Sequence, residues 1–179
     1  MIDREKYGLE PYNPRHPTEE EWNRLVDNGR KAWGYKPTKW DYRFLDMARL
    51  VASWSKDPST KVGAVIVDDK NRIVSLGYNG PPRGVEDDPS IDRDKKLKRT
   101  IHAETNAVLF ARDSLAGTSL YVTQHPCGPC AAIIAQAGIA RVVIPDAGPK
   151  LSQAWSDDIK EAQWIFEQVG IKLVRVRGK

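Results

Sequence analysis

The sequence predicts an α/β fold, a three-layer α/β/α domain built on a five-stranded mixed sheet. Five short apolar runs rich in β-branched residues are typical of strands, and the last three alternate with segments of helical periodicity. Only a polar turn separates the first two runs, which indicates an antiparallel hairpin, whereas strands joined through helices run parallel. The length of 179 residues suits one main domain.

The composition excludes several classes of protein. Apolar residues make up 40% of the chain and charged residues 29%, which argues against disorder and against a membrane protein. No run approaches the roughly 18 apolar residues of a membrane span, and the N-terminal segment lacks the apolar region of a secretory signal. Lys and Arg number 28 against 24 Asp and Glu, so nucleic acid is not an expected partner. We expect a cytoplasmic protein.

The first part of the chain, residues 1–39, is expected to be an N-terminal arm with an appended helix, followed by the main domain over 40–179. Prolines up to Pro17 indicate the extended arm, and Thr18 opens a capping box at the start of the appended helix. The main domain begins with an amphipathic helix over 42–55.

The sheet is expected to open with a buried strand over 61–67 and, after a turn at 68–71, a second strand over 73–78. Residues 79–99 are predicted to be a polar loop rich in Pro, Gly and Asp. That length favours a functional role for the loop over a simple connection.

The rest of the chain alternates helices with strands. We expect helices over 101–112 and 127–137 and a last helix from Ser156 to Gly170, with strands over 119–123, 141–144 and 172–176. Because each of the last two strands follows a helix, these three strands should be parallel to one another.

Two of the predicted helix starts carry residues that can bind a metal. His102 begins one helix, and Cys127 and Cys130, three residues apart on one face, begin the next. Thiolate and imidazole are ligands that zinc prefers, and a site with three protein ligands leaves a fourth position for water. This ligand set is typical of a catalytic zinc.

Glu104 follows the predicted ligand His102 by two residues. Two thiolates neutralise Zn²⁺, so this zinc would acidify water less than a zinc held by three neutral histidines. The positive ends of two helix dipoles favour anions at the site, and Glu104 can take a proton from the water. We therefore expect Glu104 to be the catalytic acid and base.

Each of these residues alone has a simpler explanation. His102 could be a structural histidine, Glu104 a surface acid, and the cysteine pair a redox motif or half of a structural zinc finger. The chain has only two cysteines, so none remains to complete a finger. The combination of H-x-E with P-C-x-x-C is therefore much more specific than its parts.

Several segments resemble the deoxycytidylate (dCMP) deaminases, a branch of the zinc-dependent cytidine deaminase superfamily. They are STKVGA (59–64), GYNG (77–80) with PRG (82–84), HAE (102–104) with NA (106–107), PCGPC (126–130) and QAGI (136–139). The resemblance covers residues 40–145. It implies a cytidine-deaminase-like fold and the hydrolysis of dCMP to dUMP with release of ammonia, a step that supplies thymidylate synthesis.

The same resemblance implies roles for single residues. His102, Cys127 and Cys130 would hold Zn²⁺. Glu104 would pass a proton from water to N3 of the cytosine and later protonate the departing amine.

Contacts with the nucleotide are also implied. Asn79 would reach the deoxyribose hydroxyl, and the backbone N–H of Ala103 and carbonyl of His125 would hold the edge of the base. The imidazole of His125 is expected at the pocket rim or in solvent, since a fourth protein ligand would close the site. Lys150 and Arg83 are candidates for the phosphate contact, which needs cationic or amide donors.

A regulatory site is expected in the same loop. The resemblance implies activation by dCTP and inhibition by dTTP, each with Mg²⁺, through the loop 77–84 and the predicted helix from His102 to Arg112. Gly77, Tyr78, Gly80 and Arg83 are the candidate effector-binding residues, because glycines let backbone amides approach phosphates. A homo-oligomer, most simply a hexamer, is the expected assembly.

Other functions remain open. The substrate could instead be dCTP, a 5-substituted dCMP, a free nucleoside or a tRNA base, and the chain could be a non-catalytic zinc-binding module. A glutamate beside a zinc ligand argues against the last, because structural zinc needs no such carboxylate. A fused reductase, usual in riboflavin-pathway deaminases, would need a longer chain.

Overall fold

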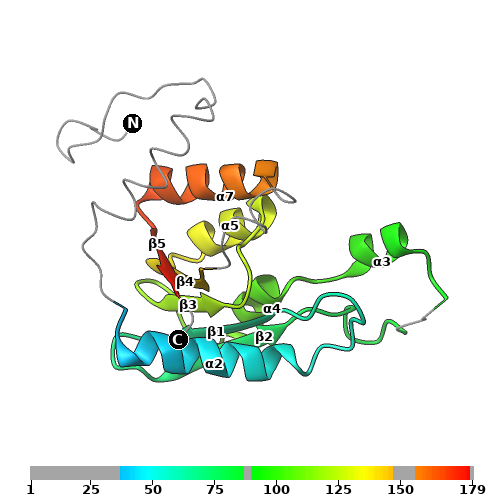
Figure 1. Ribbon diagram of the computed structural model, residues 1–179, viewed down its shortest axis with the longest axis horizontal. Helices are drawn as coiled ribbons and strands as arrows, with labels where there is room; N and C mark the ends of the chain where they lie inside the picture. Colours follow the sequence, from blue (N-terminus) through cyan, green and yellow to red (C-terminus); the bar gives the residue numbers. More distant parts are fainter. Residues whose placement is uncertain (1–36, 87–89, 147–155, 178–179) are drawn as a thin grey trace. The chain divides into compact units, whose positions relative to one another are not determined.

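The computed structural model describes residues 37–86, 90–146 and 156–177, and of Ser156 only the backbone. The residues from Pro37 onward form one unit (Figure 1). The predicted N-terminal arm and appended helix, as well as Lys150, lie outside the described residues. No helix in the described part is long and apolar enough to cross a membrane.

The five strands form one mixed sheet in the order β2-β1-β3-β4-β5. They are β1 (Gly63–Val67), β2 (Ile73–Tyr78), β3 (Ser119–Val122), β4 (Arg141–Pro145) and β5 (Lys172–Val176). β1 pairs antiparallel with β2 and with β3, and β4 pairs parallel with β3 and with β5. The predicted hairpin, mixed sheet and parallel later strands are confirmed.

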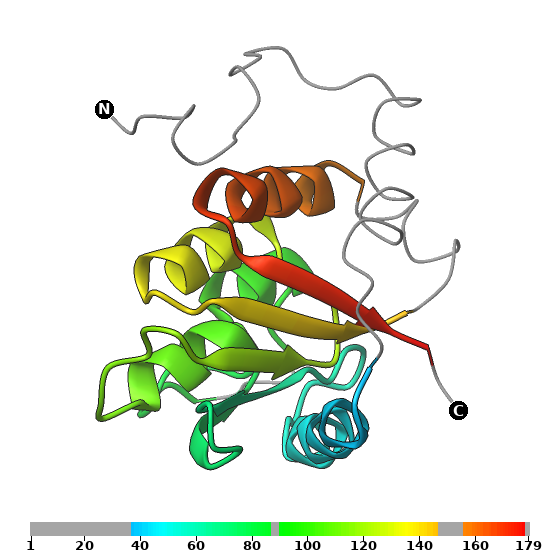
Figure 2. The same ribbon diagram turned by 90° about the vertical axis from the view of Figure 1, so that its left-hand side faces the viewer.

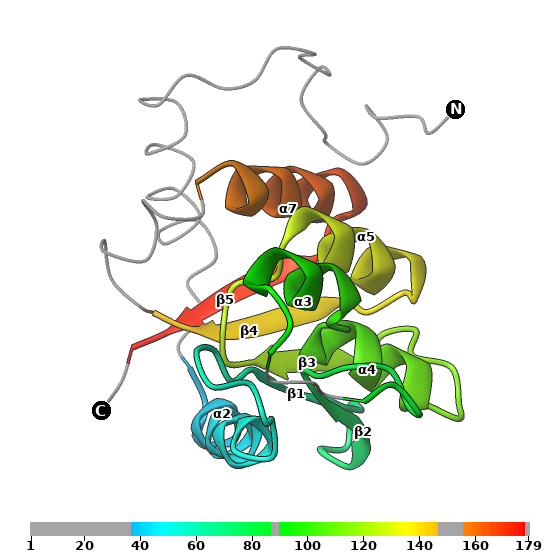
Figure 3. The same ribbon diagram turned by 90° about the vertical axis from the view of Figure 1, so that its right-hand side faces the viewer.

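Helices cover both faces of this sheet. α2 (Lys39–Ala52) packs on one face, and α4 (Ala103–Phe110), α5 (Gly128–Gln136) and α7 (Ser156–Val169) lie on the other (Figures 2 and 3). Ala64 and Ile66 of β1 belong to the core under α4, α5 and α7, so Val65 and Val67 face α2. All five residues of β1 are therefore buried. The three-layer α/β/α fold is confirmed.

The long segment after β2 differs from its prediction. It contains a helix, α3 (Arg93–Arg99), where a loop was expected over 79–99. None of the seven residues of α3 is buried, so the apolar periodicity that predicts amphipathic helices was absent. The charge pattern was present, with Asp94 in the first turn and Lys98 and Arg99 in the last.

The start of α4 is fixed by contacts with β2 and the loop after it. Gly80 and Ile101 exchange two backbone hydrogen bonds of 3.1 and 2.9 Å, so helix α4 begins at Ala103, two residues later than the predicted start at 101. A Cβ atom on Gly77 would collide with the backbone of Ala103 and Ala107. The glycine thus lets β2 and α4 pack backbone to backbone, and this contact positions the first turn of α4.

Candidate functional site

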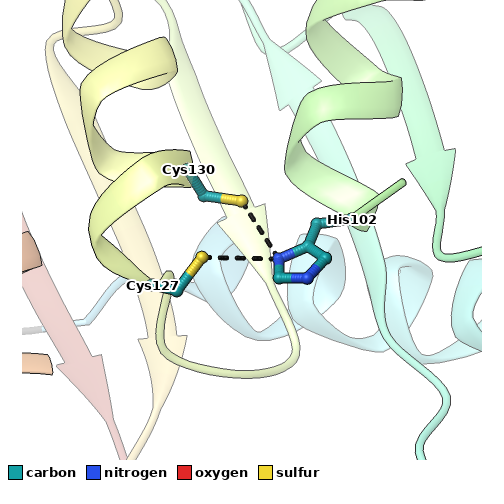
Figure 4. A group of neighbouring side chains, drawn as sticks. All are labelled: His102, Cys127 and Cys130. Atoms are coloured by element: carbon teal, nitrogen blue, oxygen red, sulfur yellow. Dashed lines mark hydrogen bonds between the residues drawn. The ribbon is translucent and has the colours of Figure 1, made fainter. Parts of the chain in front are cut away.

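Three side chains from two helices converge at one point of the molecule. The Nδ1 atom of His102 lies 3.4 Å from Sγ of Cys127 and 3.3 Å from Sγ of Cys130 (Figure 4). All three ligand atoms lie within 4.8 Å of one another, and among the described residues they form the one His/Cys/Asp/Glu group that could hold a metal ion. The cluster predicted from the sequence is thus assembled.

The local fold explains this convergence. His102 occupies the N-cap position of α4 and Cys127 that of α5, and neither side chain caps its own helix. Cys130 lies in the first turn of α5. Both helices therefore present their positive ends and unpaired first-turn amides toward the cluster. This environment favours thiolates and other anions.

The geometry of the cluster fits a tetrahedral zinc ion. Zn–S bonds of about 2.3 Å and Zn–N bonds of about 2.0–2.1 Å place nitrogen and sulfur ligands roughly 3.6 Å apart. The two N···S distances from His102 are close to that value. Cys130 is buried, Cys127 is half-buried and His102 is exposed, so the cluster is open on the histidine side.

The two cysteines affect each other's ionisation. Their hydrogen bond lowers the pKa of Cys127 and raises the pKa of Cys130. With one of the two sulfur atoms ionised, the other needs a positive charge nearby to ionise as well. A divalent cation between the two sulfur atoms supplies that charge.

Glu104 lies in the first turn of α4, directly beside the cluster. Its side chain is only 4% exposed. Burial raises the pKa of Glu104 to about 7, although the charge of His102 and a hydrogen bond from Cys130 oppose the shift. A carboxyl group with this pKa can both accept and donate a proton near neutral pH.

His125 follows β3 and precedes the cysteine motif. Its Nδ1 atom lies 2.8 Å from the carbonyl oxygen of Pro126, and burial lowers the pKa of the ring to about 4. The ring is thus neutral, and its Nδ1–H donates to Pro126. His125 is not part of the metal-ligand group, and its side chain is half-buried.

Asn79 lies directly after β2. Its Oδ1 atom accepts the backbone N–H of Val62 at 2.8 Å, and its Nδ2 donates to the carbonyl of Thr60 at 2.9 Å. Its own carbonyl accepts the hydroxyl of Ser55 at 2.8 Å. Asn79 therefore holds the segment before β1 against the end of β2. Ala103, the other predicted contact residue in this part, is fully buried at the first position of α4.

The predicted effector residues have structural partners. The amide of Gly80 donates to Ile101, and Gly77 faces the backbone of α4. The carbonyl of Tyr78 accepts Nδ2 of Asn106 at 2.7 Å. The guanidinium of Arg83 is exposed and lies 4.6 Å from the ring centroid of Phe110. Gly77 therefore has a packing role and Gly80 a role in backbone pairing. The effector site stays a prediction.

One polar neighbour of the cluster was missed. The Oγ1 atom of Thr105 lies 3.7 Å from Sγ of Cys130. In the sequence, only its position directly after Glu104 connects Thr105 with the cluster. The contact itself joins two helices, and the distance between them depends on the fold. Thr105 thus adds one polar contact to the predicted cluster.

Comparisons with known proteins point to one family. Residues 38–145 match the cytidine and deoxycytidylate deaminase zinc-binding region. An uncharacterised deaminase from the luxG 3′ region of Aliivibrio fischeri is 48% identical over 137 residues, which are 76% of this chain and 92% of that protein. Human deoxycytidylate deaminase is 37% identical over 143 residues, covering 74% of this chain and 77% of that protein.

A solved structure agrees in fold. The dCMP deaminase of the cyanophage S-TIM5, in complex with dCMP and dUMP, superposes with a TM-score of 0.66 at 25% identity. The match covers 79% of this chain and all of the phage chain.

Proposed function

This chain belongs to the cytidine and deoxycytidylate deaminase family, and from that membership we propose that it hydrolyses dCMP to dUMP and ammonia. The observation that carries the proposal is the buried Glu104 beside a triangle of His102, Cys127 and Cys130, with N···S distances of 3.3 and 3.4 Å. A zinc-binding site without catalysis has no use for a buried carboxyl group at this place.

His102, Cys127 and Cys130 would hold Zn²⁺. Zinc bound there would supply Lewis acidity toward the attacking water molecule. The side chains around the cluster would orient the substrate and move the protons. The open side of the cluster lies at the exposed His102, so a cytosine ring would approach from that side with C4 toward the metal position.

Glu104 moves the protons. Its carboxylate would accept a proton from the attacking water and deliver it to N3 of the cytosine. It would then take the proton of the hydroxyl group added at C4 and pass it to the amino group, which leaves as ammonia while the C4 carbonyl of dUMP forms. A pKa of about 7 suits both halves of this cycle, because the ionised and protonated forms are then nearly equal in free energy near neutral pH. Burial also keeps bulk water from competing for the proton.

The nucleotide is positioned by groups around the cluster. The amide of Ala103, in the first turn of α4, and the carbonyl of His125 would bind the edge of the base. The carboxamide of Asn79 keeps one N–H and one oxygen lone pair beyond its two backbone contacts, and these would bind the 3′-hydroxyl of the sugar. Arg83 and Lys150 are the proposed phosphate contacts.

Regulation and assembly extend the proposal. We propose a cytoplasmic homo-hexamer that dCTP activates and dTTP inhibits, each with Mg²⁺, at a site near Tyr78 and Arg83. Exposed Leu109 and Phe110 at the end of α4 offer an apolar surface for a second copy. Sigmoidal dCMP saturation that dCTP makes hyperbolic supports this extension, and hyperbolic kinetics indifferent to both triphosphates contradict it.

A substrate panel tests the proposed function. Ammonia release is measured with deoxycytidine, dCMP, dCTP, a 5-substituted dCMP and a tRNA anticodon stem, using the zinc-loaded protein. We expect dCMP to exceed deoxycytidine in kcat/KM by roughly ten- to a hundredfold, the value of a charge-assisted phosphate contact. Equal efficiency on the nucleoside, or a higher efficiency on another member of the panel, contradicts the assignment.

A further inference from the structure

The proposed reaction leaves one polar contact of the metal cluster without a role. Thr105, on α4, places its hydroxyl 3.7 Å from the sulfur of Cys130, on α5. The contact spans the two helices that carry the proposed ligands, and 25 residues separate the partners in sequence. Thr105 is half-buried and directly follows Glu104.

Within the described residues, the hydroxyl of Thr105 contacts Cys130 and no backbone carbonyl of its own helix. The carbonyls three and four residues back, those of His102 and Ile101, accept the amides of Asn106 and Gly80 at 2.9 and 3.1 Å. A helical threonine hydroxyl commonly bonds to the carbonyl three or four residues earlier. Here the hydroxyl is directed across to Cys130 instead.

The direction of the hydrogen bond follows from the chemistry of the ligand. A cysteine that binds zinc does so as a thiolate, which has no hydrogen to donate. The hydroxyl of Thr105 must therefore be the donor. We propose that Thr105 is a positioning residue that donates to the Cys130 thiolate and thereby orients and tunes the metal site; this inference depends on the proposed zinc-dependent function.

Two physical effects follow from such a donor. The hydrogen bond restrains the Cys130 side chain so that its sulfur keeps facing His102. It also draws electron density away from the sulfur, which then donates less charge to a bound metal. With two thiolates cancelling the charge of Zn²⁺, a weaker thiolate donor leaves the metal a stronger Lewis acid toward water.

A purely structural role predicts different behaviour. If Thr105 only fills space between α4 and α5, valine, which has the same shape, should replace it without consequence. Serine, which keeps the hydroxyl and loses the methyl group, should then be the more harmful change. The donor role predicts the opposite order, so the pair of variants separates the two explanations.

The experiment compares Thr105→Val and Thr105→Ser with the wild type. Zinc affinity is measured by competition with a chelator, and the thiolate-to-metal charge-transfer band is recorded after Co²⁺ is substituted for zinc. We expect Thr105→Val to bind zinc about tenfold more weakly or worse, as for other residues that support metal ligands. Its Co²⁺ band should move to longer wavelength, because the sulfur electrons are less stabilised. Thr105→Ser should retain both wild-type values.

Thr118→Val is the matched control. Thr118 is buried, and its hydroxyl donates to the carbonyl of Leu115 at 2.7 Å, directly before β3 and so at the end of that strand opposite the cluster. Loss of the Thr118 hydroxyl should change neither the zinc affinity nor the Co²⁺ charge-transfer band. If Thr105→Val fails to fold, as judged by circular dichroism, Thr105→Ala takes its place.

The outcomes are separable. A wild-type affinity and band in Thr105→Val, or equal losses in the valine and serine variants, overturn the role of Thr105 while the wild type still binds zinc and deaminates dCMP. A wild-type protein that binds no zinc or releases no ammonia from dCMP overturns the proposed function itself.

Discussion

Asp41 and Arg141 form an ion pair of 2.6 Å between Oδ1 and Nη2 that ties helix α2 to strand β4. The hydroxyl of Tyr121 donates to the same carboxylate oxygen at 3.0 Å and accepts Nη1 of Arg141 at 2.9 Å. Burial raises the pKa of Tyr121, so the phenol stays protonated and keeps donating. Because Leu120 and Val122 face the core under α4 and α5, Tyr121 and this network lie on the α2 face.

Removing the acid from this network should destabilise the fold without touching the metal cluster. Asp41 is fully buried, and its other oxygen accepts two hydrogen bonds from Thr38 before α2. Asp41→Ala should lower the free energy of unfolding in urea by about 3–5 kcal/mol, because the variant loses the largely buried ion pair with Arg141 and the hydrogen bonds from Tyr121 and Thr38. Asp46→Ala breaks only an exposed pair with Arg49 and should cost less than about 1 kcal/mol. Equal losses in the two variants would disprove the role of the network.

The contact between β2 and α4 predicts a contrast between two glycines. A Cβ atom on Gly77 would collide with the backbone of Ala103 and Ala107, whereas one on Gly80 meets nothing within 4 Å. Gly77→Ala should therefore lower the free energy of unfolding by about 1–3 kcal/mol and reduce deamination, because the first turn of α4 must shift. Gly80→Ala should change the unfolding free energy little. Similar unfolding curves for both variants would refute this account of the packing.

Substitution of the buried carboxyl group should separate catalysis from metal binding. Glu104→Gln removes the proton carrier and leaves all three ligands in place. We expect kcat to fall by about 10²–10⁴-fold, the usual contribution of a general acid and base, with the zinc content unchanged. Glu167→Gln, an exposed change on α7, is the control and should keep full activity. Retention of more than about a tenth of the wild-type rate by Glu104→Gln is incompatible with its role.

Activity should depend on pH through the same group. Burial raises the pKa of Glu104 to about 7, and only the ionised form accepts a proton from water. Burial, the largest cause of this shift, is the same when a metal is bound, so the pKa of Glu104 should stay above its ordinary value of 4.5 in the holoenzyme. We expect kcat/KM to fall as pH decreases below about 7. An acidic limb near 4.5, the ordinary value for a glutamate, would contradict the effect of burial.

Stability should respond to pH in the opposite sense. The pKa of Glu104 in the folded protein lies above its value of 4.5 in the unfolded chain. The stabilisation from its protonated form is thus complete below about pH 4.5 and is lost as pH rises through about 7. Unfolding of the metal-free protein at pH 8 checks this sign: Glu104→Gln should be more stable than the wild type there. A less stable variant at pH 8 would refute it.

Much of the site was predictable because its residues are local to two helix starts. The helix starts predicted from the sequence already place His102 at the beginning of α4, and Cys127 and Cys130 at the beginning of α5. Contacts that depend on how strands pair were not predictable. Asn79 donates to Thr60 and accepts from Val62, and both hydrogen bonds form only because β1 and β2 lie side by side.

The missed features share a physical cause. Helix α3 has no buried face, so binary patterning carries no signal for it. The close approach of Gly77 to α4 and the contact of Thr105 with Cys130 depend on the spacing between elements. The residue types do not determine the distance between two packed elements. Sequence spacing thus identified the metal-binding chemistry, and tertiary packing determined the groups that support it.

The zinc content of the purified protein and of three variants tests the central claim most directly. The account predicts close to one zinc ion per chain in the wild type and in Glu104→Gln. It predicts a large loss of zinc in His102→Ala and Cys127→Ala, because each removes one of three converging ligands. Wild-type zinc in Cys127→Ala, or active wild-type enzyme without zinc, would contradict the account.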